Sequence, residues 1–280
     1  MTQHEDVRKR WNNLADYWIS RVRNGEDSWR EYMNAPAFKK MIGDVQGLRL
    51  LDLACGEGYF SRFYAKAGAE VTGIDISESM IAAAQEEESK TPLGIQYHIA
   101  DASKIDFMES ESFDVIISFM ALMDIEDYEE AIRQASRVLK PGGRFVFIIV
   151  HPCFGWSRRC DGETFCEWEY RRLENGSREP LYLKIFEYFT RHPYDIVWSV
   201  NRSQESYVTS QFHRTLTDYM KTLRKNGFVV SQIEEPKPVE DKSVLPQNMG
   251  KLFRVPHTIC VEAQKLSFFD KLQPKENQAP

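Results

Sequence analysis

Short apolar runs rich in branched side chains alternate, through the middle of the chain, with longer stretches whose apolar residues recur at helical spacing. Such runs are typical of buried strands, and such stretches are typical of amphipathic helices. The expected strands cover residues 48–54, 70–75, 95–100, 113–119 and 144–150, and the expected helices cover residues 58–67, 77–88 and 127–139. The strict alternation predicts an α/β fold with a doubly wound, mainly parallel sheet and right-handed crossovers.

Two amphipathic helices are expected before this sheet, over residues 6–20 and 28–42, and they could cover a pocket or cap the core. The alternation fails over residues 151–211, where mixed aromatic and charged residues favour antiparallel strands and loops. It resumes with a helix over residues 216–225 and strands over residues 228–233 and 257–263. The predicted organisation is an N-terminal helical cap (1–43), a central domain (44–150 and 212–265), an inserted substrate cap (151–211) and a flexible tail (266–280).

The composition narrows the class of protein. The 280 residues are 42% hydrophobic, enough for a full core, and the longest apolar run, residues 145–150, is far shorter than the roughly 20 residues of a membrane-spanning helix. A polar N-terminus and five scattered cysteines predict a cytoplasmic protein with free thiols. The formal net charge of −6 argues against nucleic acid as a partner, no membrane partner is expected, and the oligomeric state stays open.

The strongest chemical signal is a glycine turn that joins the first strand of the sheet to a helix. Gly56 and Gly58 allow the backbone to approach a ligand, and the following helix begins with unpaired N–H groups. Asp75 ends the next strand, where a carboxylate can accept both hydroxyls of a ribose. The pair of signals predicts an adenosine ligand, although a glycine turn alone also occurs as a plain strand-to-helix connection.

The charge of this turn separates two classes of adenosine ligand. A dinucleotide pyrophosphate favours three open glycines, whereas Ala54 replaces the first and Ser61 stands at the third. Asp52 and Glu57 bracket the turn with negative charge, which suits an ammonium and a sulfonium better than a pyrophosphate. The residues therefore favour S-adenosylmethionine over NAD(P), and an NAD(P)-dependent oxidoreductase is the alternative.

The same residues resemble a known family. Residues 52–58 are similar to motif I of the class I, Rossmann-like S-adenosylmethionine-dependent methyltransferases, Asp75 to their ribose-binding acid, and residues 100–102 to the turn that holds adenine. Residues 113–118 and 137–143 are similar to the family's fourth strand and the turn before its fifth, and Trp11 with Tyr17 to an N-terminal element that closes over the cofactor. The resemblance implies a small-molecule methyltransferase with a seven-stranded sheet whose last strand is antiparallel.

The resemblance also implies the cofactor contacts. The glycine turn would hold the methionine tail, Asp75 the ribose, Ile76 and Met80 the faces of adenine, and Asp101 the adenine amine. Ser118 and Met120 would line the methionine end. Met80 and Met120 could equally be core residues, Asp101 a surface acid, and Tyr17 part of the helix core. The implied cofactor-binding residues are Tyr17, Asp52, Ala54, Cys55, Gly56, Gly58, Asp75, Ile76, Met80, Asp101, Ala102, Ser118 and Met120.

Methyl transfer from a sulfonium needs alignment of the reactants more than it needs catalytic groups. His151, directly after the fifth strand, is the candidate base, and a hydrogen bond to a nearby loop is its alternative role. No metal is expected, because the gaps among His151, Cys153, Cys160 and Cys166 do not match a zinc site. A noncatalytic S-adenosylmethionine-binding protein also remains an alternative.

The inserted cap is rich in aromatic residues that could form an acceptor pocket for an apolar or cationic molecule, or only the small core of a lid. These residues are Phe154, Trp156, Phe165, Trp168, Tyr170, Tyr182, Phe186, Tyr188, Tyr194 and Trp198. The acceptor and the attacking atom stay undetermined at this point.

Overall fold

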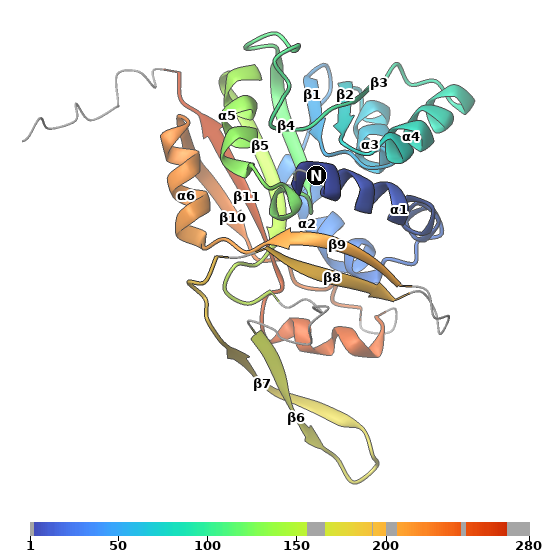
Figure 1. Ribbon diagram of the computed structural model, residues 1–280, viewed down its shortest axis with the longest axis vertical. Coiled ribbons are helices and arrows are strands. Elements are labelled where there is room, and N and C mark those ends of the chain that lie inside the picture. The colour runs from blue at the N-terminus through green and yellow to red at the C-terminus, as the bar shows by residue number, and fades with distance from the viewer. Residues whose placement is uncertain (1–2, 156–165, 192, 200–205, 242–244, 268–280) are drawn as a thin grey trace, which may run out of the picture.

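The computed structural model describes residues 3–155, 166–191, 193–199, 206–241 and 245–267. Its centre is a sheet formed by seven strands: β1 (Arg49–Leu53), β2 (Glu70–Asp75), β3 (Gln96–Ile99), β4 (Phe113–Phe119), β5 (Leu139–Val150), β10 (Phe228–Glu234) and β11 (Thr258–Lys265). Their order is β10-β11-β5-β4-β1-β2-β3 (Figure 1). Strands β1 to β5 pair in parallel, whereas β11 is antiparallel to both β5 and β10. The predicted doubly wound sheet with an antiparallel last strand is confirmed.

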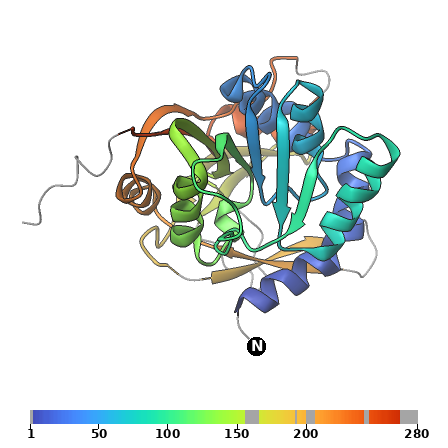
Figure 2. The ribbon, with the colours of Figure 1, turned by 90° about the horizontal axis from the view of Figure 1, so that it is seen from above.

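Helices cover both faces of the sheet (Figure 2). One face packs on α2 (Ala35–Ile42), α3 (Tyr59–Lys66) and α4 (Glu78–Lys90), and the other packs on α5 (Tyr128–Val138) and α6 (Leu216–Lys225). Successive residues of a strand point to opposite faces, so Leu50 belongs to the first core and Leu51 to the second. The strands therefore consist of almost continuous apolar residues, because each is buried on both sides.

Local signals set the helix boundaries. The Ser77 hydroxyl accepts the Met80 amide at 3.2 Å and caps α4 as expected. Thr215 and Asp218 form a capping box that begins α6, and the helix ends at Lys225 before Asn226 and a left-handed Gly227. Helix α5 ends at Val138, and β5 begins at once at Leu139, so residues 141–143 form an irregularity within the strand where a separate turn was expected.

The N-terminal segment contains α1 (Gln3–Arg23), the short π-helix η1 (Arg30–Asn34) and α2, in the two places predicted for helices. A proline follows the wide turn of η1. Pro36 has no N–H, so the carbonyl four residues earlier, that of Tyr32, lacks its usual helical partner. That carbonyl accepts the amide of Val239 at 2.8 Å, which ties the N-terminal helices to the C-terminal part of the chain.

Residues 151–211 contain antiparallel hairpins, as predicted. Strands β6 (Cys166–Arg172) and β7 (Arg178–Ile185) form one, and β8 (Pro193–Ser199) and β9 (Ser206–Phe212) form the other. The β8–β9 hairpin lies beside α1, whereas the β6–β7 hairpin extends away from the sheet (Figure 1). Trp156, Cys160, Phe165 and the tail after residue 267 lie outside the described residues. The division of the chain into domains stays a prediction.

Candidate active site

A cavity of about 440 Å³ opens at the carboxyl edge of the sheet, within the usual range for small-molecule sites. Its floor includes residues directly after β1, β2 and β4 and the last residue of β5: Ala54, Ile76, Met120 and Val150. Its roof comes from α1 and the β8–β9 hairpin. Open α/β sheets bind their ligands at this edge.

The glycine turn of the floor has three residues with positive φ: Ala54 at 60°, Gly56 at 55° and Gly58 at 81°. Gly56 lines the cavity, and a Cβ added there would meet no atom within 4 Å. A Cβ on Gly58 would lie 2.3 Å from the Tyr97 hydroxyl. This glycine therefore allows the turn to pack on Tyr97 of β3, and its expected contact with the cofactor stays a prediction.

Asp75 lines the cavity at the end of β2, and two backbone amides fix its carboxylate. Gly56 donates to Oδ2 and Ser77 donates to Oδ1, each at 2.9 Å. Burial raises the pKa of this carboxyl. Because a carboxylate oxygen can accept more than one hydrogen bond, both oxygens can still accept ribose hydroxyls.

Asp52 is buried at the cavity wall. Its Oδ2 accepts the Ser61 hydroxyl at 2.6 Å, and burial raises its pKa to about 7. Cys55 also lines the cavity, and burial raises the pKa of its thiol well above the usual value. The thiol is therefore protonated at neutral pH, which fits packing rather than nucleophilic chemistry.

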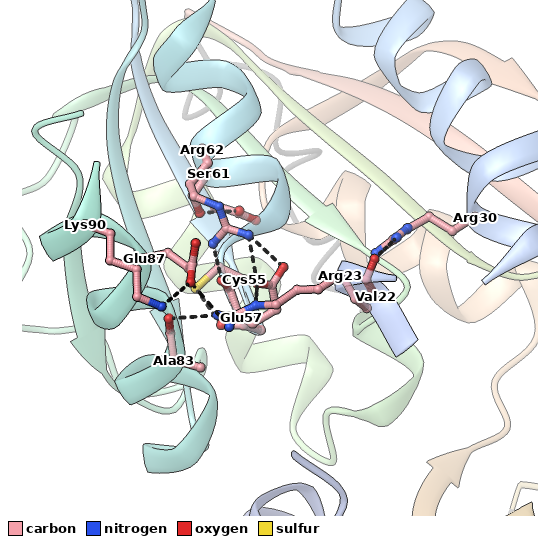
Figure 3. Close-up of polar contacts among 12 residues, drawn as sticks. Val22, Arg23, Arg30, Cys55, Glu57, Ser61, Arg62, Ala83, Glu87 and Lys90 are labelled. Carbon is pink, nitrogen blue, oxygen red and sulfur yellow. Dashed lines mark hydrogen bonds and ion pairs between the residues drawn. The ribbon is translucent and has the colours of Figure 1, made fainter. Parts of the chain in front are cut away.

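Glu57 behaves differently from the sequence expectation. Its side chain is 2% exposed, and Arg62 Nη2 lies 2.7 Å and Arg23 Nε 3.3 Å from Oε2 (Figure 3). Two cations thus compensate the charge that was expected to attract an ammonium and a sulfonium. The expectation of an uncompensated acidic turn is wrong at Glu57, because Arg23 comes from α1 and Arg62 from α3.

The expected adenine end of the site is split between two spaces. Ile76 and Met80 line the main cavity, whereas Asp101 and Ala102 line an adjoining space of about 40 Å³ that shares Ala54 and Ile76 with it. Asp101 Oδ1 accepts the amide and the hydroxyl of Ser103, at 2.9 and 2.7 Å.

Two residues of β4 and its following turn were expected at the methionine end. Met120 lines the cavity with a φ of 54°, but Ser118 is fully buried and is not part of the wall. Phe119 lines the cavity instead, since adjacent strand residues face opposite sides of the sheet.

Tyr17 does not reach the cavity, contrary to expectation. Its ring stacks on Tyr207 of β9 with centroids 5.9 Å apart, and its hydroxyl accepts a bond from Arg21 at 3.3 Å. Other residues of α1 line the cavity, among them Trp11, Trp18 and Arg21. The helix position was predicted correctly, but its rotation was not.

His151 is also absent from the cavity wall. It is buried, its Nδ1 accepts the Cys153 amide at 3.1 Å, and its Nε2 donates to Glu235 Oε1 at 3.1 Å. Burial lowers its pKa. The loop-binding alternative fits this arrangement, and the role of catalytic base does not.

Two titratable residues that sequence reasoning missed do line the cavity. Burial raises the pKa of Asp124 to about 7, and burial lowers that of His257 to about 3. Asp124 follows β4 at the carboxyl edge, a position that could have identified it, and its Oδ1 accepts the Gln211 amide at 3.3 Å. His257 directly precedes β11. Because β11 runs antiparallel to β5, its first residue lies at the carboxyl edge of the parallel strands, and predicting this position required the strand direction.

The inserted segment contributes to the cavity through one hairpin. Of the aromatic residues expected to form an acceptor pocket, Trp198 lines the cavity, whereas Tyr194 packs with Cys166 and Ile196 in a small separate core. The other aromatic cavity residues lie in α1, directly before η1, at the start of α3 or at the end of β4: Trp11, Trp18, Trp29, Tyr59, Phe60 and Phe119. The interpretation as a lid core fits Tyr194, whereas Tyr170, Tyr182 and Phe186 are exposed.

Comparisons with known proteins agree with this geometry. Residues 51–147 match the family model described as a methyltransferase domain. A ubiquinone biosynthesis O-methyltransferase from Coxiella burnetii is 34% identical over 110 residues, which cover 39% of this chain and 47% of that protein. One from Hydrogenovibrio crunogenus is 31% identical over 139 residues, covering 49% and 57%. The chain thus spans about half the length of these curated relatives.

Solved structures match over most of the chain. An S-adenosylmethionine-dependent methyltransferase from Mesorhizobium loti is 28% identical with a TM-score of 0.64, covering 82% of this chain and 96% of that one. A putative one from Listeria monocytogenes is 27% identical with a TM-score of 0.65, covering 83% and 96%. The chain has the fold of the class I, Rossmann-like S-adenosylmethionine-dependent methyltransferases, and residues 51–147 match a methyltransferase domain. Its cofactor is S-adenosylmethionine, and Gly56, Asp75 and the open space beside them fit that molecule.

No helix within the described ranges has the length and hydropathy to cross a bilayer.

Proposed function

We propose that this chain transfers a methyl group from S-adenosylmethionine to a small-molecule acceptor. The observation that carries the proposal is one continuous cavity, with the glycine turn and Asp75 in its floor and an aromatic roof opposite them. The cofactor supplies an activated methyl group on a sulfonium. The chain's own residues bind the two reactants, align them and exclude water, which together account for much of the rate of such a displacement.

Within the cavity, Asp124 is the residue best suited to receive a proton from the acceptor. It lines the wall, is held by Gln211 and has a pKa near neutrality, where a general base is most effective. Arg214 donates to the backbone carbonyls of Leu122 and Glu126 on either side, at 3.0 and 2.8 Å, and so fixes the loop that carries it. The four described cysteines are free thiols, which supports action in a reducing compartment such as the cytoplasm.

The test is calorimetric titration with S-adenosylhomocysteine, NAD and NADP. S-adenosylhomocysteine should bind, and Asp75→Ala should weaken it about tenfold or more, because two ribose hydrogen bonds to a charged group are lost. Glu70→Ala, at the exposed opposite end of β2, is the matched control and should bind normally. Binding of a dinucleotide alone would exclude the proposal. A labelled-methyl assay against a metabolite mixture then separates an enzyme from a silent binder.

A further inference from the structure

The roof of the cavity carries far more aromatic surface than a cofactor requires. Four of the chain's six tryptophans line this one cavity: Trp11, Trp18, Trp29 and Trp198. Trp18 meets Trp11 edge to face at 6.3 Å and Trp198 at 5.2 Å, so α1 and the β8–β9 hairpin share one aromatic surface. This surface lies across the cavity from the glycine turn and Asp75, which belong to the floor.

Among the described residues of the cavity wall, the charged side chains have, with one exception, no buried polar atom left without a hydrogen-bond partner. Each of the others takes part in a described hydrogen bond or ion pair: Asp27, Arg30, Asp52, Glu57, Asp75 and Asp124. Arg30 is paired with Glu31 at 2.7 Å and also donates to the Val22 carbonyl. Its charge is therefore compensated without a ligand.

Arg21 is the exception. Among the residues that the structure describes, no carboxylate pairs with it, and its Nε is buried with no hydrogen-bond partner. Its Nη1 donates only to the neutral Tyr17 hydroxyl at 3.3 Å. A buried guanidinium N–H left unsatisfied is costly, and a carboxylate is the group that matches its geometry best.

Resting on the proposed function, we infer that the methyl acceptor is a planar aromatic acid. Its ring packs among the roof tryptophans, and its anionic group pairs with Arg21. A cationic acceptor of the kind that aromatic surfaces often bind would meet an uncompensated like charge here, and a neutral one would leave Arg21 unpaired. Among the ligands that the same aromatic surface could accommodate, an acid is therefore the one that pairs with Arg21.

The test uses three probes that share one ring and chain and differ only in charge: cinnamate, cinnamyl alcohol and cinnamylamine. Each is titrated into protein saturated with S-adenosylhomocysteine, with tryptophan fluorescence and calorimetry as readouts. Cinnamate should quench the fluorescence and bind about tenfold tighter than the alcohol, with the amine weakest. Arg21→Gln should reduce cinnamate affinity to that of the alcohol, and Arg21→Lys should restore part of it.

Lys9→Gln is the matched control, because it removes one positive charge from the exposed face of the same helix and should leave all three affinities unchanged. Tighter binding of the amine, equal binding of all three probes or absence of cinnamate binding would overturn the inference while leaving cofactor binding intact. The inference would also be overturned if Arg21→Gln weakened the binding of S-adenosylhomocysteine but not that of methylthioadenosine. Arg21 would then bind the carboxylate of the cofactor. Failure of S-adenosylhomocysteine itself to bind would instead overturn the proposed function.

Discussion

At the scale of single residues, the clearest change of role concerns the proton acceptor. Both ring nitrogens of His151 are hydrogen-bonded, one to Cys153 and one to Glu235, whereas Asp124 lies at the cavity wall. With an acceptor found in the labelled-methyl assay, Asp124→Asn should lower kcat by about 10²–10⁴-fold and change S-adenosylhomocysteine affinity little. The wild-type rate should rise with pH through about 7, as the carboxylate ionises, and this rise should vanish in the variant.

Groups on neighbouring elements share the surroundings of Asp124: Asp75, Asp101, Glu126 and Arg214. Glu129→Gln, in the exposed first turn of α5, is the control for loss of an acid nearby and should retain the wild-type profile. A profile that keeps its inflection in Asp124→Asn would assign the proton to another group.

Gly58 gives a second prediction at this scale. Gly58→Ala should destabilise the protein by about 1–3 kcal/mol, since the new methyl group meets Tyr97 and the backbone stays left-handed. Combining it with Tyr97→Phe, which removes the hydroxyl 2.3 Å away, should recover part of that loss. Thermal unfolding of the two single variants and the double variant measures the coupling; strict additivity would show that the contact does not matter.

The sequence predicts the location of a side chain well where the residue directly follows a strand. It predicts the location less well where the rotation of a helix or a partner distant in sequence determines it. Asp75, Gly56 and Ile76 were placed correctly at the cavity, because the end of a parallel strand fixes their location. Tyr17 and Ser118 were not, because one residue of rotation or alternation moves a side chain to another face. The compensation of Glu57 depends on Arg23, which is 34 positions away in sequence.

At the scale of elements, α1 is attached to the floor of the site at two points. Asn12 Oδ1 accepts the Ser77 hydroxyl at 2.6 Å, and Arg23 contacts Glu57, the Ala83 carbonyl and Glu87. Figure 3 shows the Arg23 side chain reaching from the end of α1 to the turn and to α4.

Arg23→Gln should loosen this attachment without unfolding the sheet. We expect faster hydrogen exchange across α1 and an affinity for S-adenosylhomocysteine several-fold weaker, because closing the roof then gains less free energy. Exchange in β4 and β5 should not change, and Lys9→Gln should match the wild type throughout. Unaltered exchange in α1 would mean that the tryptophan contacts alone hold the helix.

The regular elements were predictable because buried parallel strands and capped helices each leave a local pattern. Strands β2 and β4 and helix α6 have the predicted bounds, and the others differ by a few residues. The pairing of the inserted strands could not be predicted, since the hairpins expose one side and their mixed residues give no clean alternation. The β8–β9 hairpin contacts α1, and this tertiary contact distinguishes it from the β6–β7 hairpin, which extends away from the sheet.

At the scale of the whole molecule, buried acids make stability depend on pH. Burial raises the pKa of Asp52 to about 7 in the folded state, whereas the pKa of an aspartate in the unfolded chain is near 4. Between these two pH values the folded state holds a proton that the unfolded state has lost. This contribution to stability is therefore greatest at low pH and is lost as pH rises toward 7. Asp124 acts in the same direction, whereas His257, with its lowered pKa, opposes both below about pH 6.5.

Asp52→Asn removes the ionisation and retains an acceptor for Ser61. Its melting temperature should exceed that of the wild type clearly at pH 8 and only slightly at pH 5, as measured by circular dichroism without cofactor. An equal effect at both pH values would indicate a packing change rather than the loss of a buried charge.

The global architecture was predictable as a class, whereas the composition of the cavity was not. An ion pair joins Arg10 of α1 to Asp195 of β8, two residues separated by 185 positions, and no local pattern signals such a contact. The sequence therefore predicted both a possible cover from the N-terminal helices and a possible pocket in the insertion, but not that the two form one roof.

The roof has an evolutionary consequence. The segment that matches the methyltransferase family, residues 51–147, contains the floor residues Ala54, Ile76 and Met120, whereas α1 and the β8–β9 hairpin lie outside it on either side. Substitutions in the roof can therefore change which compound is methylated without changing the residues that bind the methyl donor. Sequence similarity within residues 51–147 therefore indicates a shared methyl donor. The specificity for the methyl acceptor can diverge independently among related proteins.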